Sequence, residues 1–222
     1  MNRSWSQTLV ITVLVSILSI GFTLSQSLAD KLDDNVINRE EIGKMLTLKN
    51  PDSLSNYYKN LYLPNIVYRV VYWTRLATLS PTARNLGELI SCVPQDRIEN
   101  EILSLLSDNV LGDSTLDAQA GRIFDYECLK LCATAVRTDR RHYPRLFRYV
   151  LSCDGSVAMN ANGVITELAN NDIENFFRRL DEEHEKLEAS ILGAIEYVPK
   201  RKDLEPIRNK IPRRFWVFLH LR

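Results

Sequence analysis

Four cysteines, Cys92, Cys128, Cys132 and Cys153, are the residues of this sequence with the widest choice of chemistry. Thiols pair as disulfides, bind a metal as thiolates, or pack in a core as small apolar groups. No C-x-x-C pair is present, which disfavours a zinc site. Because the count is even and the N-terminus looks like an export signal, we expect two disulfides. Cys128 and Cys132 lie one helical turn apart, so each is expected to pair with Cys92 or Cys153; one bridge, or none, is the alternative.

Two acid-to-histidine spacings have the geometry of a metal-binding helix. Asp181-x-x-His184 with Glu188 places two carboxylates and an imidazole on one face, and Asp139-x-x-His142 repeats the spacing. A bundle metal site needs further glutamates, and Arg140 and Arg141 lie beside His142, where they would repel a cation, so we expect no metal and no cofactor.

Two basic surfaces are candidates for contact with an anion or a partner, because guanidinium groups bind phosphate and carboxylate bidentately. The first holds Arg141, Arg145 and Arg148. The second lies near the C-terminus and holds Arg213, Arg214 and Trp216. Internal pairing of the first surface with the acids at 181–188 is an equally good interpretation.

The sequence has no enzyme signature such as G-x-S-x-G, H-E-x-x-H or a phosphate-binding glycine loop. This favours a non-enzymatic role. The formal net charge is +0, which gives no general attraction to nucleic acid, so no nucleic-acid partner is expected.

Residues 1–29 resemble a secretory signal. Arg3 precedes an apolar run over 9–24, and Ser27-Leu28-Ala29 suits signal peptidase, so the segment is a cleaved signal peptide or a retained signal-anchor helix. In either case we expect the body to be exported across the membrane, and to be secreted, periplasmic or membrane-anchored outside the cytosol.

The body, 30–199, is predicted to be mainly α, a helical bundle or helical array, because its apolar residues recur at steps of three and four. Helices are expected over 30–48, 66–79, 115–137 and 143–151, and a helix through 91 is expected to begin at Ser80. The β-branched and aromatic content of 66–79 would also suit a strand. Its aromatic residues, with those of 57–62, line either a core or a ligand groove.

Two further features complete the predicted body. Asn162-Gly163 suits a tight type I′ turn, which predicts a short β-hairpin near residues 156–166. Residues 173–198 carry a heptad seam of apolar residues with one polar member, His184, which predicts a long helix able to form a homo-oligomer.

Residues 200–222 form a basic-aromatic tail. Three prolines, at 199, 206 and 212, prevent a continuous helix, and basic residues outnumber acids. We expect this tail to lie outside the core and to contact anionic lipid or an acidic surface.

Two functions follow. The first is an exported or membrane-anchored helical protein that acts through protein–protein contacts. The second is a helical domain that binds a small ligand or lipid through the arginine surface or the aromatic cluster. An internal pocket lined by aromatics would favour the second, and a filled core with an exposed apolar groove would favour the first.

Overall fold

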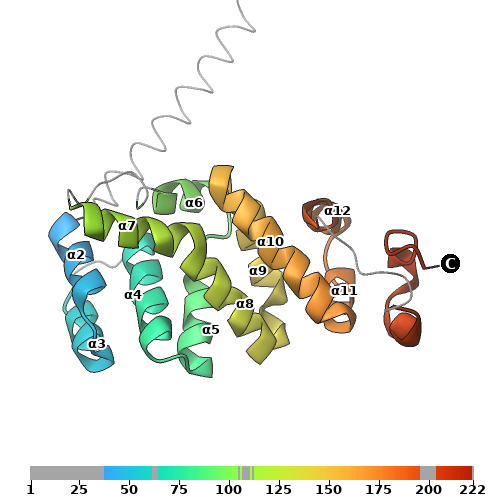
Figure 1. Cartoon of the computed structure of the whole chain (residues 1–222), viewed down its shortest axis with the longest axis horizontal. Helices are drawn as coiled ribbons and strands as arrows, with labels where there is room; N and C mark the ends of the chain where they lie inside the picture. Colours follow the sequence, from blue (N-terminus) through green and yellow to red (C-terminus); the bar gives the residue numbers. More distant parts are fainter. Residues whose placement is uncertain are drawn as a thin grey trace, which may run out of the picture. The chain divides into compact units, whose positions relative to one another are not determined.

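The structure is a computed structural model that describes residues 38–61, 65–104, 106, 111, 113–195 and 204–221. These residues are mainly helical and contain no strand, which confirms the predicted mainly α fold (Figure 1). They all belong to one unit, Asn38–Arg222. The predicted signal or anchor, 1–29, lies outside the described residues. None of the described helices is both long enough and apolar enough to cross a bilayer.

The elements follow one another as α2 (Arg39–Thr47), α3 (Pro51–Lys59), α4 (Ile66–Leu79), α5 (Ala83–Cys92), α6 (Arg97–Ser104), α7 (Ser114–Arg122), the π-helix η2 (Ile123–Glu127), α8 (Cys128–Thr138), the 3₁₀ turn η3 (Arg140–His142), α9 (Tyr143–Ser152), α10 (Gly155–Asn171), α11 (Ile173–Asp181), α12 (Glu185–Ala194), and the 3₁₀ turns η4 (Glu205–Lys210) and η5 (Arg213–Phe215).

Asparagine side chains determine where three of the early helices begin. Asn38, Asn50 and Asn65 each accept hydrogen bonds from the backbone N–H groups two and three residues further on. These donors have no partner within the helix, so each asparagine stabilises its helix start. The start of α5 differs from the prediction, because Thr82 caps it and not Ser80.

The helix α4 is surrounded by other elements. It contacts α2, α3, α5, α6, α8 and η2. Its buried residues lie on most of its circumference and include Ile66, Val67, Tyr68, Val70, Val71, Tyr72, Thr74, Leu76 and Ala77. A helix that is apolar nearly all round is stable only when it is buried, so packing selects helix over strand for this segment.

The predicted β-hairpin near 156–166 is wrong, because α10 runs through it as one helix. The buried residues of α10 include Val157, Ala161, Val164, Ile165, Leu168 and Ala169, which follow helical spacing. The Asn160 side chain also donates to the Asp125 carbonyl oxygen at 3.0 Å and ties α10 to η2. Burial of one apolar face therefore overrides the turn preference of Asn162-Gly163.

The predicted continuous helix over 173–198 is also wrong, because α11 ends at Asp181 and α12 begins at Glu185. His184 lies between them, exposed, and its Nδ1 accepts a hydrogen bond from the Lys186 N–H at 3.2 Å. It caps α12 and does not lie on an apolar seam. The break lets both helices contact α9 and α10, which buries the apolar residues Ile173, Phe177, Leu180 and Ile191 within the chain. A homo-oligomer through this segment stays a prediction.

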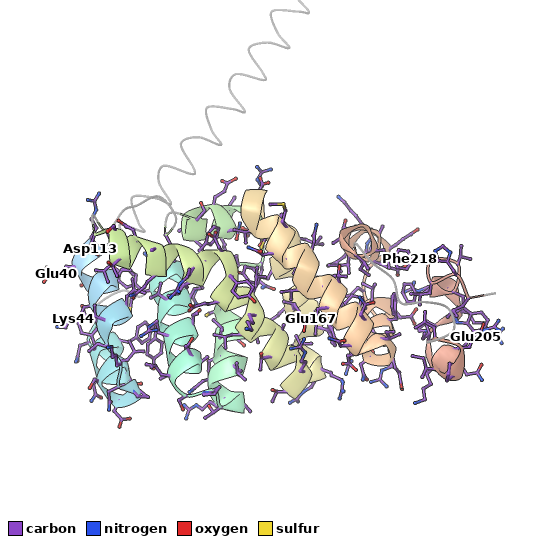
Figure 2. The ribbon with its side chains drawn as sticks, viewed as in Figure 1. Glu40, Lys44, Asp113, Glu167, Glu205 and Phe218 are labelled. Atoms are coloured by element: carbon purple, nitrogen blue, oxygen red, sulfur yellow. The ribbon has the colours of Figure 1, made fainter. Side chains whose placement is uncertain are left out.

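The tail belongs to the core over its described residues, 204–221, contrary to the expectation. Leu204, Ile211, Phe215 and Leu219 are buried. Phe215 contacts Phe177 of α11 with ring centroids 5.1 Å apart, and Phe177 in turn contacts Phe176. Phe218, labelled in Figure 2, lies 6.4 Å from the Phe177 ring. The apolar run that suggested a membrane contact is therefore used to cover α11.

Replacing Gly163 with alanine should stabilise the protein by about 0.5–1 kcal/mol, because glycine within a helix costs backbone entropy. A Cβ at this position would meet no atom within 4 Å. Thermal unfolding measures the change. In a type I′ turn the same substitution would destabilise, so a lower melting temperature would contradict the helix. Gly43→Ala is the comparison variant. Its Cβ would lie 3.2 Å from Leu116 Cδ1, so this substitution should increase stability less than Gly163→Ala.

Replacing Phe215 with alanine should destabilise the protein by about 3 kcal/mol, the usual cost of removing a buried ring. Phe215 is 1% exposed. Val217→Ala is the control, since Val217 is 86% exposed and its truncation should change stability by less than about 0.5 kcal/mol. Equal unfolding midpoints for the two variants in urea would show that the tail is not docked.

Candidate functional site

The four cysteines are free thiols, so the predicted disulfides are not formed. Cys92, Cys128 and Cys132 are buried and Cys153 is half-buried. Electrostatic interactions connect Cys128 with each of the other three, so the thiols gather around it. They behave as small apolar core residues. An even number of cysteines is equally compatible with this role and with disulfide pairing, so the sequence could not distinguish the two.

Burial is the main cause of the raised pKa of three of these thiols. It raises the pKa of Cys153 to about 12 and the pKa of Cys92 further. Burial and the neighbouring Cys128 raise the pKa of Cys132. The hydrogen bond with Cys132 acts in the opposite direction and lowers the pKa of Cys128, a thiol that is buried. Because the thiolate is the reactive and metal-binding form, Cys92, Cys132 and Cys153 are poorly suited to either chemistry near neutral pH.

The first predicted basic surface is largely paired within the chain. Arg141 forms an ion pair with Asp139 and lowers the pKa of that carboxyl. Arg145 donates to the Ser91 carbonyl oxygen at 2.8 Å. Arg148 lies 3.7 Å from Glu183, the kind of internal pairing with the acidic segment that the sequence suggested.

The second predicted surface faces acids too. Arg214 pairs with Asp181 and, at 2.7 Å, with Glu188, while Arg213 lies 5.7 Å from the Trp216 ring centroid. Trp216 Nε1 donates to the Ile211 carbonyl oxygen at 3.0 Å. Contact of the tail with anionic lipid stays a prediction.

The acid-to-histidine spacings do not converge on a metal site. Asp181 and Glu188 both contact Arg214, and His184 is used as a helix cap. Among the described residues, no group of histidine, cysteine and acidic side chains is arranged to hold a metal ion.

Two residues of the aromatic cluster, Tyr68 and Tyr72, are buried in the core, and Tyr58 and Trp73 are half-buried against them. Tyr58 stacks on Tyr72 at 3.9 Å, and Tyr72 meets Trp73 edge-on at 4.7 Å. The Tyr68 hydroxyl accepts a hydrogen bond from the Asn38 N–H at 2.9 Å, which ties α4 to the start of α2. These contacts favour the core interpretation over a ligand groove.

A shallow groove of about 250 Å³ lies between η2–α8 and α10. We call it the α8–α10 groove; its lining is Tyr126, Lys130, Ala133, Thr134 and Arg137 on one side, and Met159, Asn160, Gly163, Val164 and Glu167 on the other. Asn160 contacts Asp125 near one end, and Arg137 pairs with Glu167 near the other. The two helices therefore run in the same direction along it; Figure 2 labels Glu167 on α10.

The groove has an apolar end and a small-residue middle. Four large hydrophobic side chains are exposed in the described part of the chain, and two of them, Tyr126 (49%) and Met159 (69%), line this groove. Ala133 and Gly163 leave room between the helices. Lys130 Nζ lies 5.6 Å from the Tyr126 ring centroid and has no ion-pair partner among the described residues.

The sequence did not point to Tyr126, Lys130 or Met159 as contact residues. Tyr126 and Lys130 are one turn apart, which is a weak signal, but the hairpin prediction placed Met159 and Gly163 in a different element. Comparison with protein families, with characterised proteins and with solved structures gives no significant match.

At about pH 8 an alkylating reagent should label the native thiols only slowly, because three are buried and the raised pKa of Cys153 keeps it protonated. Unfolding in denaturant without reductant should expose four reactive thiols. Mass spectrometry counts the added groups. Two or more unlabelled cysteines after unfolding would mean that a disulfide forms in the native protein.

Proposed function

We propose that this chain is an exported or membrane-anchored helical protein that acts through contacts with another protein, and that the α8–α10 groove is its contact surface. The observation that carries the proposal is the pair of exposed apolar side chains, Tyr126 and Met159, at one end of a groove whose middle is formed by small residues. Contiguous exposed apolar surface is typical of interaction sites.

Charge indicates the kind of partner segment that fits. Lys130, beside the apolar end, has no ion-pair partner in the described part of the chain, whereas Arg137 is paired with Glu167 at the other end. An apolar side chain placed between Tyr126 and Met159, with an acid next to it on the partner, would bury apolar area and give Lys130 its counter-ion. A helix with one such apolar stripe suits a groove between two helices.

The packed aromatic cluster supports this choice over the second function. Tyr72 is 5% exposed and its hydroxyl donates to Ser55 Oγ at 3.1 Å, so its polar group is satisfied within the chain. The Tyr58 ring stacks on Tyr72 and Tyr68 is buried, so these rings contact other residues of the chain.

Photo-crosslinking tests the proposal. The full chain carries a photoreactive amino acid in place of Met159 and is expressed in the cell that naturally makes it. We expect one dominant crosslinked protein, and no such product when the photoreactive residue replaces the exposed Val217 instead.

Two matched variants distinguish binding at the groove from non-specific association. Gly163 and Gly193 are both exposed helix glycines where an added Cβ meets nothing within 4 Å. Gly163→Phe fills the groove and should abolish the crosslink, while Gly193→Phe in α12 should leave it unchanged. Equal crosslinking in both variants would contradict the proposal. A product made of two copies of this chain would show that the groove mediates a homo-oligomer.

A further inference from the structure

A second hollow, of about 280 Å³, lies where the end of α2, the helix α4 and the junction of α7 with η2 meet. We call it the basic pocket; its polar lining is Thr47, Lys49, Arg75, Gln119, Arg122 and Glu127. The lining comes from three segments that are far apart in the sequence. The buried side chains of Leu46 and Ile123 complete its wall.

Arg75 is the feature of this pocket that calls for a ligand. It is the half-buried cation of the otherwise largely buried α4, and Nη2 donates to the Leu48 carbonyl oxygen at 3.2 Å. Its Nε is buried and has no hydrogen-bond partner among the described residues. No ion pair to Arg75 is found within those residues. A buried donor of a charged group without an acceptor is unfavourable. A shift of the half-buried Arg75 side chain toward an oxyanion in the pocket would give this N–H an acceptor.

The charges around Arg75 also favour an anion. Lys49 and Arg122 add two cations, and Glu127 is the one carboxylate in the lining. Arg122 Nη2 lies 3.8 Å from Glu127 Oε1, which is too long for a hydrogen bond, so the donors of Arg122 stay available. The formal charge of the lining is +2, which matches a dianion.

The π-helix places two of these side chains. The Cys128 N–H bonds to the Ile123 carbonyl oxygen, five residues back, and this wide turn carries both Ile123 and Glu127 into the wall of the pocket. Single π-helical turns within α-helices occur frequently at functional sites.

We propose that the basic pocket binds the phosphate group of a small phosphate monoester, with the Arg75 guanidinium as its principal donor. The fork of a guanidinium matches two phosphate oxygens, and Lys49 and Arg122 supply the remaining positive charge. Gln119 can donate from its side-chain amide. The size of the hollow suits a phosphate with a small substituent. This site is separate from the α8–α10 groove and does not depend on it.

Calorimetric titration of the full chain in non-ionic detergent tests the proposal. The probes are inorganic phosphate, phenyl phosphate and succinate at about pH 7.5, where a phosphate ester is dianionic because its second pKa is about 6. We expect saturable binding of both phosphates at one site, and binding of succinate at least about tenfold weaker. Equal affinity for succinate would overturn the assignment to phosphate, and no saturable binding of any probe would overturn the site.

Some variants are expected to weaken binding and another to tighten it, so that the test does not depend on how well each variant folds. Arg75→Gln should weaken phenyl phosphate binding at least about tenfold, and Lys49→Gln should weaken it less because Lys49 is exposed. Glu127→Gln removes the negative charge and should tighten binding about threefold or more, a gain that misfolding cannot produce. Arg97→Gln is the control, because Arg97 is an exposed arginine paired with Glu101 and lies outside the pocket. Unchanged affinity in both Arg75→Gln and Glu127→Gln would overturn the site.

Vesicles of phosphatidylcholine with and without phosphatidic acid distinguish a lipid headgroup from a soluble ester. Flotation of the full chain with phosphatidic acid vesicles that is lost in Arg75→Gln supports the phosphate site and assigns a lipid source. Saturable binding of phenyl phosphate, together with no flotation with either kind of vesicle, supports the phosphate site and indicates that its ligand is a soluble ester. Flotation that persists in Arg75→Gln, together with no binding of soluble phosphates, would overturn the proposal.

Discussion

The burial of α4 is the constraint on which the N-terminal half of the described chain depends. Nine of its 14 residues are buried, so helices on several sides must each present an apolar face to it. The free energy of this burial offsets the weak intrinsic helix preference of its valines and tyrosines. The same crowding determines the fate of its polar residues: Thr74 is enclosed beside Cys128, and Arg75 lies where three segments leave a hollow.

In the C-terminal half, opposite charges and edge-to-face or tilted aromatic rings perform the equivalent task. Aromatic contacts run from Tyr143 through Phe176 and Phe177 to Phe215, and join α9, α11 and η5. Ion pairs such as Lys210 with Glu174, at 3.0 Å, surround them. Exposed pairs of this kind contribute little stability individually, but they neutralise most of the basic residues that the sequence offered as contact surfaces. Among the described residues, the cations that have no carboxylate partner then become informative, and these include Lys130 and Arg75.

The π-helix η2 links the two candidate sites. Tyr126 of this turn lies on the α8–α10 groove, while Ile123 and Glu127 face the basic pocket. A regular α-helix repeats its faces every 3.6 residues, and one wide turn shifts the faces of α8 relative to those of α7. The elements on either side of η2 therefore present polar side chains to different hollows, which explains how one nearly continuous helix contributes to both.

The sequence by itself determined the helical class, the bounds of the segment that becomes α4 and the near continuity of helix over 115–137, because apolar spacing and capping residues act locally. Packing decided that the α4 segment is a helix and not a strand. Tertiary structure decided the rest. Asn162-Gly163 has the local preference of a turn, but burial of Val157, Ala161 and Val164 makes it helical. The heptad seam continues past His184, but packing of α11 and α12 on α9 breaks it there. Whether a thiol pairs, or an arginine finds a carboxylate, depends on which residues distant in sequence become neighbours. For that reason the basic pocket, assembled from residues as far apart as Lys49 and Glu127, left no pattern in the sequence.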